Sequence, residues 1–208
     1  MGLFVKRSEI GNNLPLYRIG AEKTLLVAGL GNPGAEYSQT RHNIGFAVAD
    51  KLVEAEKGSW HEKKTLKCHI AELKLGDKRV IVIKPTTFMN NSGESLIAVQ
   101  QYYKIPSSDT LVLHDELDIA FGSIRSSFGG SSAGHNGLKS IITLIGLDFQ
   151  RLRIGIGPKS PAEIDSADFV LAKFSKEEQS KLKPIINESL TMINDFVFGS
   201  LKPETRKI

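Results

Sequence analysis

Cysteine is nearly absent from this chain of 208 residues, which contains only Cys68. A single thiol cannot form an intramolecular disulfide, and it cannot supply a cysteine-rich zinc site. No apolar run is long enough to span a bilayer, and no apolar segment typical of a secretory signal follows Lys6-Arg7. These absences exclude a disulfide-stabilised secreted scaffold, and they predict a cytoplasmic protein without a membrane partner.

The excess of one charge sign is also small. The chain has 27 Lys and Arg residues and 23 Asp and Glu residues, which gives a net charge of +4 and a sequence pI near 9.1. This balance weakly favours a polyanionic partner such as nucleic acid. The hydrophobic fraction of 40% and the charged fraction of 24% are those of an ordinary globular protein.

The chain divides into a short extension and one domain. Residues 1–23 precede the first predicted strand, and Gly11-Asn12-Asn13 and Pro15 break any regular pattern there. We expect a poorly ordered N-terminal extension over 1–23 and a single domain over 24–208, because no later segment reads as a linker.

Strands alternate with helices along this domain, which predicts the α/β class. We expect Ser92 to cap a helix that runs to about Tyr103, and Gly76-Asp77-Lys78 to form a hairpin turn. A capping box at Ser175-Lys176-Glu177-Glu178 opens a long helix, within which Pro184 predicts a kink or a restart. The predicted strands are 25–30, 70–75, 80–83, 111–113, 123–128 and 152–156, and the other predicted helices are 43–57 and 135–144.

Two glycine-rich motifs suggest activities that their contexts disfavour. Gly29, Gly31 and Gly34 have the spacing of a dinucleotide-binding turn, but Pro33 removes one backbone N–H where a pyrophosphate would bind. Gly130-Ser131-Ser132-Ala133-Gly134 fits the nucleophile elbow of serine hydrolases, yet the only histidine after it is the nearby His135. We therefore expect neither a nucleotide cofactor nor a catalytic serine.

Metal binding is not expected either. None of the five histidines pairs at the i, i+4 spacing of zinc enzymes. The cluster His114-Asp115-Glu116-Leu117-Asp118 follows a predicted strand and could hold a hard cation, but a solvated turn is the favoured interpretation.

Neutral amides and one histidine remain as candidates for chemistry. The amides lie in turns near predicted strand ends: Asn32, Asn90, Asn91 and Asn136. Asparagine also favours turns for purely local reasons, so each of these alone has a structural alternative. Together with His42 and Asp115 they fit a hydrolase in which a histidine activates water, a carboxylate fixes its tautomer and amides hold an oxyanion.

Several longer motifs resemble the bacterial-type peptidyl-tRNA hydrolase family, in one order from about residue 25 to 174. They are Gly29-Leu30-Gly31-Asn32-Pro33-Gly34, Tyr37 with Thr40-Arg41-His42-Asn43, Pro85-Thr86-Thr87-Phe88-Met89-Asn90, His114-Asp115-Glu116-Leu117-Asp118, Gly134-His135-Asn136-Gly137-Leu138-Lys139 and Arg151-Leu152-Arg153-Ile154-Gly155-Ile156-Gly157. The resemblance implies a mixed, twisted sheet between helices, of the phosphorylase/hydrolase-like kind. It also implies a monomeric enzyme, without metal or cofactor, that cleaves the ester between a peptide and the 3′ end of tRNA.

The resemblance also implies roles for individual residues. His42 would be the general base with Asp115 as its partner, and Asn32 and Asn90 would position the substrate and the oxyanion. The remaining substrate-binding residues would be Tyr37, Phe88, Met89, Asn136 and His135. Arg125, Lys139 and Arg153 are the candidates for contact with tRNA phosphates, with solvated or structural charge as the alternative.

Two departures from the family pattern are present. Ser127 stands where the family usually has a second basic residue, which reduces the expected phosphate contacts. Ala133 precedes Gly134 where the family commonly has two glycines, and we expect this change to affect only loop mobility.

Two other functions stay open at this level. An RNA-binding relative without hydrolysis, like the chloroplast group II intron splicing factors, would keep the fold, but the candidate catalytic positions are all filled here. An esterase for small acyl esters would use the histidine and amides but would leave the basic surface without a purpose.

Overall fold

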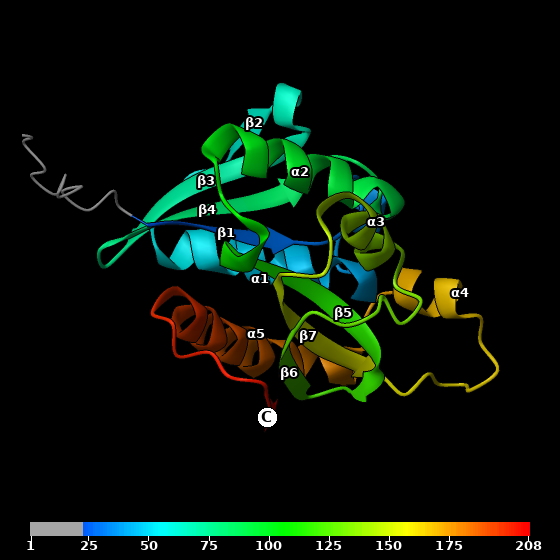
Figure 1. Ribbon diagram of the computed structural model, residues 1–208. Helices are drawn as coiled ribbons and strands as arrows, with labels where there is room; N and C mark the ends of the chain where they lie inside the picture. Colours follow the sequence, from blue (N-terminus) through cyan, green and yellow to red (C-terminus); the bar gives the residue numbers. More distant parts are fainter. Residues whose placement is uncertain (1–22) are drawn as a thin grey trace, which may run out of the picture.

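In the computed structural model, residues 23–208 are described, and they form one eight-stranded sheet covered by helices on both faces (Figure 1). The prediction of a poorly ordered N-terminal extension concerns residues outside this range, except for Lys23. Within residues 23–208, no helix has both the length and the apolar character needed to cross a bilayer.

The sheet is mixed, with strand order β2-β3-β4-β1-β5-β7-β6-β8. Strands β4, β1, β5 and β7 run parallel to one another, and antiparallel strands complete both sides. The strands are β1 (Thr24–Gly29), β2 (His61–Lys63), β3 (Cys68–Leu75), β4 (Lys78–Pro85), β5 (Thr110–Ala120), β6 (Ser123–Phe128), β7 (Gln150–Gly157) and β8 (Glu204–Lys207). The helices are α1 (Ile44–Ala55), α2 (Ser92–Tyr103), α3 (Asn136–Ile145), α4 (Ser166–Leu171) and α5 (Lys176–Val197). Short 3-10 helices occur at η1 (Ala35–Tyr37), η2 (Arg41–Asn43), η3 (Lys64–Leu66), η4 (Met89–Asn91) and η5 (Ser107–Asp109).

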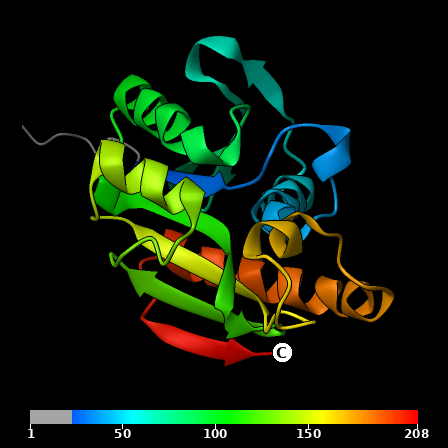
Figure 2. The same ribbon diagram turned by 90° about the vertical axis from the view of Figure 1, so that its right-hand side faces the viewer.

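Strand β1 is buried on both faces, as its continuous apolar sequence predicts. Leu25 and Val27 face the core formed with α1 and α5, whereas Leu26 and Ala28 face the core formed with α2 and α3. Figures 1 and 2 show these two helical layers on opposite sides of the sheet. The predicted α/β class and sandwiched sheet are confirmed.

Two expectations about local structure are wrong: a restart of the helix at Pro184 and a helix cap at Ser92. Helix α5 begins with the predicted capping box of Ser175 and Glu178, but it continues through Pro184 to Val197 without a restart. Leu182 before Pro184 and Ile185 after it both pack against the core, so tertiary packing holds the helix on both sides of the proline. Helix α2 is preceded by Asn91, and Ser92 is already helical, with its hydroxyl donating to the Met89 carbonyl.

Strand β5 extends through the acidic cluster, so the interpretation of this cluster as a solvated turn is also wrong. The strand pairs in register with β7 as far as Glu116 and, after a register shift, again at Ala120. His114 is fully buried and Asp115 is only 3% exposed, whereas Asp118 is exposed. The first polar groups of the cluster therefore lie inside the fold, in the middle of a central strand.

A close approach of α1 to the sheet places the loop that carries His42. A Cβ atom added at Gly45 would collide with backbone atoms of Leu113 and Leu30, and one added at Gly29 would collide with the backbone of Gly45. Only glycine fits where helix and strand backbones meet this closely. Helix α1 and the preceding η2 consequently sit against the ends of β1 and β5.

Arg41 joins η2 to the segment between α4 and α5. Its guanidinium donates to the Lys173 carbonyl at 2.9 Å and to the Glu178 carboxylate at 2.7 Å. The guanidinium carbon also lies 4.3 Å from the centre of the Phe169 ring. Because the Arg41 side chain is only 9% exposed, this ion pair is a structural contact shielded from water.

We predict that Arg41→Ala lowers the free energy of unfolding by about 3 kcal/mol, because it removes the ion pair with Glu178 and the side-chain donor to the Lys173 carbonyl in a partly buried site. The measurement is urea unfolding of both proteins. Lys51→Ala is the control: it breaks an exposed pair with Glu54, and the expected change is below about 0.5 kcal/mol. An equal decrease of the free energy of unfolding in the two variants would contradict a structural role for Arg41.

We also predict a pH-dependent stability that comes from His114. Burial, above all, and the neighbouring His135 lower the pKa of His114 from 6.5 to about 3. The unfolded chain takes up this proton near pH 6.5 and the folded chain does not, so stability should fall as the pH falls from about 6.5 toward 3, by up to about 1.4 kcal/mol per unit. His114→Asn keeps a donor near the ring Nδ1 position but cannot titrate, and its stability should change less over this range. Identical pH profiles would refute the assignment.

Candidate active site

A cleft of about 610 Å³ opens at the carboxyl end of β1 and beside the middle of β5, just beyond the point where Gly29 pairs with Leu113. It receives side chains from the loop after β1, from η2 and η4, from β5, and from α3 and α4. Of the residues predicted for the site, eight line this cleft: Asn32, His42, Phe88, Met89, Asn90, Asp115, His135 and Asn136. The ninth, Tyr37, does not line it but packs edge-on against Phe88, with ring centres 6.2 Å apart.

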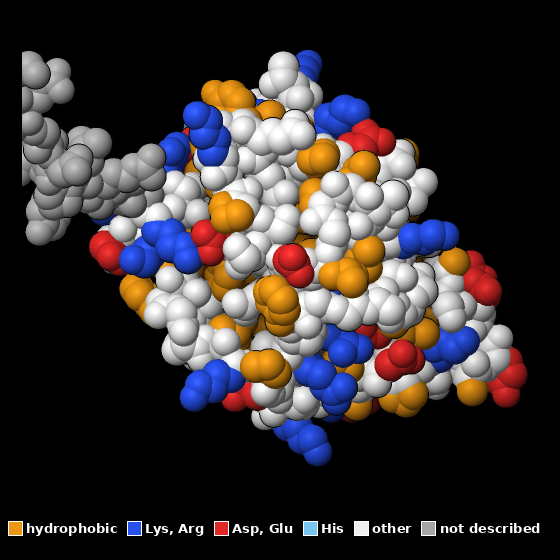
Figure 3. Space-filling view, viewed as in Figure 1, with side chains coloured by type: hydrophobic (Ala, Val, Ile, Leu, Met, Phe, Trp, Pro, Cys, Tyr) orange, Lys and Arg blue, Asp and Glu red, His pale blue; other side chains and the backbone are white. Residues whose placement is uncertain are grey.

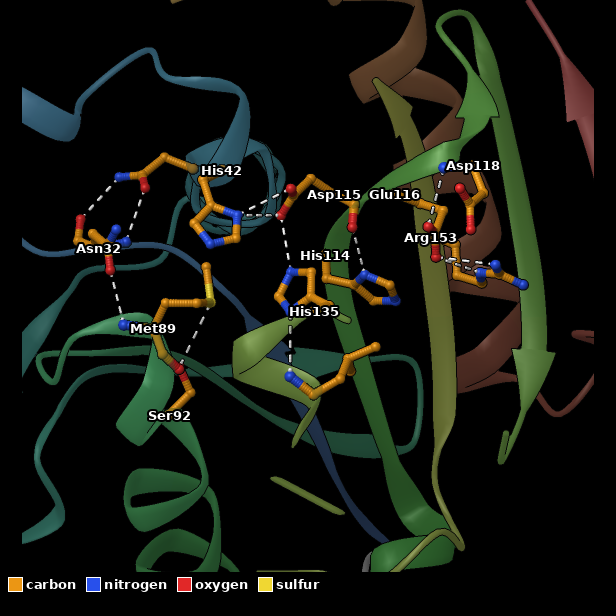
Figure 4. Close-up of polar contacts among 12 residues, drawn as sticks. Asn32, His42, Met89, Ser92, His114, Asp115, Glu116, Asp118, His135 and Arg153 are labelled. Atoms are coloured by element: carbon orange, nitrogen blue, oxygen red, sulfur yellow. Dashed lines mark hydrogen bonds and ion pairs between the residues drawn. The ribbon is translucent and has the colours of Figure 1, made fainter. Parts of the chain in front are cut away.

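His42 and Asp115 form a hydrogen-bonded pair at the floor of the cleft. His42 Nδ1 lies 2.9 Å and 3.0 Å from the two carboxylate oxygens of Asp115. Because an ionised carboxylate can only accept, Nδ1 carries the proton and donates it. The other ring nitrogen, Nε2, points away from Asp115 and keeps a lone pair (Figure 4).

Asp115 has a second imidazole neighbour that the sequence did not reveal. His135 Nε2 lies 3.0 Å from Asp115 Oδ1. Burial alone would raise the pKa of the Asp115 carboxyl, but His135 and His42 outweigh it and hold this pKa well below its usual range. The carboxylate is therefore ionised although it is almost completely buried.

Asn32 is fixed by two neighbouring segments. Its backbone N–H donates to Asn43 Oδ1 at 2.8 Å, and Asn43 Nδ2 donates to the Asn32 carbonyl at 2.9 Å. Its side-chain oxygen accepts from the Met89 N–H at 2.8 Å, which leaves the amide nitrogen without a partner among residues 23–208. That nitrogen is an oriented donor in the cleft. Asn43 holds the Asn32 backbone in this orientation. No signal in the sequence distinguished Asn43 from its neighbours as a residue with this role.

The other candidate amides differ in position. Asn90 and Asn136 are exposed and line the cleft, and their side chains make no hydrogen bond within the described part of the chain. Asn91 precedes α2 and does not line the cleft. The cleft thus has three amide groups available to a ligand, from three separate segments.

One wall of the cleft is apolar. Phe88 and Leu171 are 56% and 40% exposed, and Val170 lies beside Leu171 in the lining. Helix α4, which supplies Val170 and Leu171, was missed in the sequence, although its N-cap residue Asp165 is a helix-start signal. The apolar wall provides contact area for a ligand with hydrophobic side chains.

The three predicted phosphate-binding residues lie outside the cleft. Arg125 and Arg153 are cross-strand neighbours on β6 and β7, and Lys139 is exposed on α3. Arg153 Nε donates to Glu116 at 3.0 Å and Arg125 Nε to Thr205 at 2.9 Å. In Figure 3, Lys and Arg side chains gather over the region of β6 and β7, beside acidic groups.

The structure also locates Ser127 and Ala133, the two residues that depart from the family pattern. Ser127 pairs with Arg151 across β6 and β7. Ala133 has a φ of 45°, in the left-handed region that favours glycine. Besides the expected change in loop mobility, Ala133 therefore holds the backbone in a conformation that costs alanine more than glycine.

The group His42, Asp115 and His135 has spacing that could suit a metal, with one potential ligand atom of each within 4.8 Å of the others. A metal needs a lone pair on each imidazole nitrogen that faces it. His135 Nδ1 accepts from the Leu138 N–H at 3.2 Å, so in this fold His135 Nε2 bears the proton. The arrangement is a hydrogen-bonded cluster rather than a preformed metal site.

Comparison with known proteins relates this chain to one protein family. The family model described as peptidyl-tRNA hydrolase matches residues 26–208. A peptidyl-tRNA hydrolase of Rickettsia bellii is 47% identical over 154 residues, which cover 74% of this chain and 83% of that protein. One of Rickettsia conorii is 46% identical over 164 residues, which cover 78% of this chain and 88% of that protein.

Solved structures agree with the sequence relatives. A crystal structure of peptidyl-tRNA hydrolase from Acinetobacter baumannii superposes with a TM-score of 0.78 at 36% identity, over 86% of this chain and 90% of that one. A single-site mutant of the enzyme from the same organism gives a TM-score of 0.81 at 35% identity, over 86% and 91% of the two chains. On this agreement of sequence and fold, the chain belongs to the peptidyl-tRNA hydrolase family.

Proposed function

We propose that this protein hydrolyses the ester between a peptide, or an N-blocked aminoacyl group, and the 3′ end of tRNA, and so returns tRNA to translation. Family membership supports the reaction, and one observation in the cleft supports the mechanism. His42 donates through Nδ1 to a buried carboxylate and has a free lone pair on Nε2. This is the arrangement of a general base.

In the proposed reaction His42 Nε2 takes a proton from water while the water oxygen attacks the ester carbonyl carbon. Asp115 stabilises the imidazolium that forms. The tetrahedral intermediate then collapses, the bond to the ribose 3′ oxygen breaks, and that oxygen takes the proton from His42. The products are a peptide carboxylate and free tRNA, and no covalent intermediate with the protein is needed.

The amides would hold the substrate during these steps. The amide nitrogen of Asn32 and the side chain of Asn90, which both line the cleft, would donate to the carbonyl oxygen as it becomes an oxyanion. Asn136 would hold the peptide end and the attacking water, and Tyr37, Phe88 and Met89 would contact the peptide. His135 is not assigned a contact with the peptide, because both of its ring nitrogens already have partners in the protein.

The tRNA body would lie over β6 and β7. Arg125, Lys139 and Arg153 are proposed to contact phosphates, and Ser127 removes one charge from that surface. We further propose that residues 24–208 form the catalytic domain, which acts as a cytoplasmic monomer without metal or cofactor. The start of β1 at Thr24 and the family match from residue 26 support the domain boundary.

We predict that His42→Ala lowers kcat for release of N-acetylated aminoacyl groups from tRNA by roughly 10²- to 10⁴-fold, because the general base is lost. Affinity for tRNA should remain within about twofold, since His42 contacts the reacting centre only. Treatment of the native protein with a chelator should leave its activity unchanged. Native protein that binds tRNA without cleaving the ester would favour the RNA-binding alternative.

A second prediction concerns Asn43, which would act through Asn32. Asn43→Ala removes both hydrogen bonds to the Asn32 backbone and should lower kcat/KM by roughly 10- to 100-fold, because a small displacement of the donor weakens transition-state contacts. Asn91→Ala is the matched control, since Asn91 is exposed and outside the cleft. Activity of Asn43→Ala equal to that of the control would contradict this role.

A further inference from the structure

His135 has no ring nitrogen free for a substrate. Its Nδ1 lies 3.2 Å from the Leu138 N–H, and its Nε2 lies 3.0 Å from Asp115 Oδ1. His135 is the N-cap residue of α3, and its side chain accepts one of the backbone N–H groups that a helix leaves unpaired at its start. Figure 4 shows a dashed line at each ring nitrogen of His135, one of them to Asp115.

The helix cap decides the tautomer of this imidazole. A backbone N–H can only donate, so His135 Nδ1 must present a lone pair to Leu138. The proton of the neutral ring is then on Nε2, where it is directed at Asp115. A proton on Nδ1 would face the Leu138 N–H and the positive end of α3, which disfavours it.

We propose that His135 is a positioning residue of the proposed hydrolysis, which holds the Asp115 carboxylate in the orientation that His42 requires, rather than a ligand of the substrate. Asp115 Oδ1 accepts from both imidazoles, and Oδ2 accepts from His42. The donor from His135 thereby fixes the rotation of the carboxylate about its Cβ–Cγ bond. This inference rests on the proposed function of the same cleft.

Packing around the ring supports a fixed orientation. The buried His114 ring lies edge-on to His135, with centres 5.0 Å apart. On another side, a Cβ atom added at Gly137 would lie 3.0 Å from His135 Cε1 and 2.5 Å from Met89 Sδ, so these groups meet closely. The His135 side chain is itself only 9% exposed, which leaves the ring little freedom to turn toward a substrate.

The same contact joins the catalytic pair to a substrate-binding segment. Asn136 directly follows His135 and lines the cleft, and Ala133 and Gly134 line it from the loop before. By anchoring the first turn of α3 to Asp115, His135 sets the distance between Asn136 and the general base. Loss of this anchor should therefore affect turnover more than binding.

Two substitutions separate the two hydrogen bonds of His135. Asn can cap α3 in place of Nδ1 but is too short to reach Asp115, whereas Gln can place an amide N–H near Nε2 but caps poorly. We expect His135→Asn to keep its Tm and to lose about tenfold in kcat with KM within twofold. His135→Gln should recover most of the native kcat and melt at a lower temperature.

The kinetic outcomes are decisive if the native protein hydrolyses N-acetyl-aminoacyl-tRNA. A raised KM with unchanged kcat in His135→Asn would make His135 a substrate ligand and overturn the proposal, as would native kcat in that variant. Inactive native protein would instead count against the proposed function.

Nitrogen NMR of the native imidazoles gives a test that needs no activity and no variant. His135 should be the tautomer protonated on Nε2. Protonation on Nδ1 would overturn the proposal, whatever the kinetics of the variants.

Discussion

The buried carboxylate of Asp115 is the constraint on which the site depends. An ionised group that is 3% exposed must be fully hydrogen-bonded, and the donors come from His42 and His135. Each donor belongs to a different segment, one just before α1 and one at the start of α3. Satisfying a single charge therefore fixes the positions of two helices and directs the free nitrogen of His42 into the cleft.

The sheet makes this convergence possible. Strands β1 and β5 are adjacent and parallel, and β1 ends at Gly29 opposite Leu113, so the loop after β1 lies beside His114 and Asp115 in the middle of β5. The glycines at positions 29 and 45 allow α1 to touch the strand backbones. The side chain of Asn43 is thereby placed to hydrogen-bond the backbone of Asn32. Contacts that stabilise the fold and contacts that orient the cleft are in large part the same contacts.

Most of the fold could be predicted from local pattern, because apolar periodicity and turn residues mark β1, the β3–β4 hairpin and the main helices directly. The acidic cluster could not, since Asp115 is buried by partners about 73 and 20 residues away along the chain. For the same reason the sequence did not predict the hydrogen bond from His135 to Asp115 or the hydrogen bonds between Asn43 and Asn32. Helix α4 and strands β2 and β8 were missed because they are short, and their positions depend on packing and pairing rather than on propensity.

A double-mutant cycle between His42 and Asp115 on kcat tests most directly whether these residues act as one catalytic unit. The account predicts that His42→Ala combined with Asp115→Ala is about as slow as His42→Ala alone, because a carboxylate that acts through the imidazole has no effect once the imidazole is gone. Losses that multiply in the double variant would show that Asp115 acts independently and would contradict the proposed mechanism.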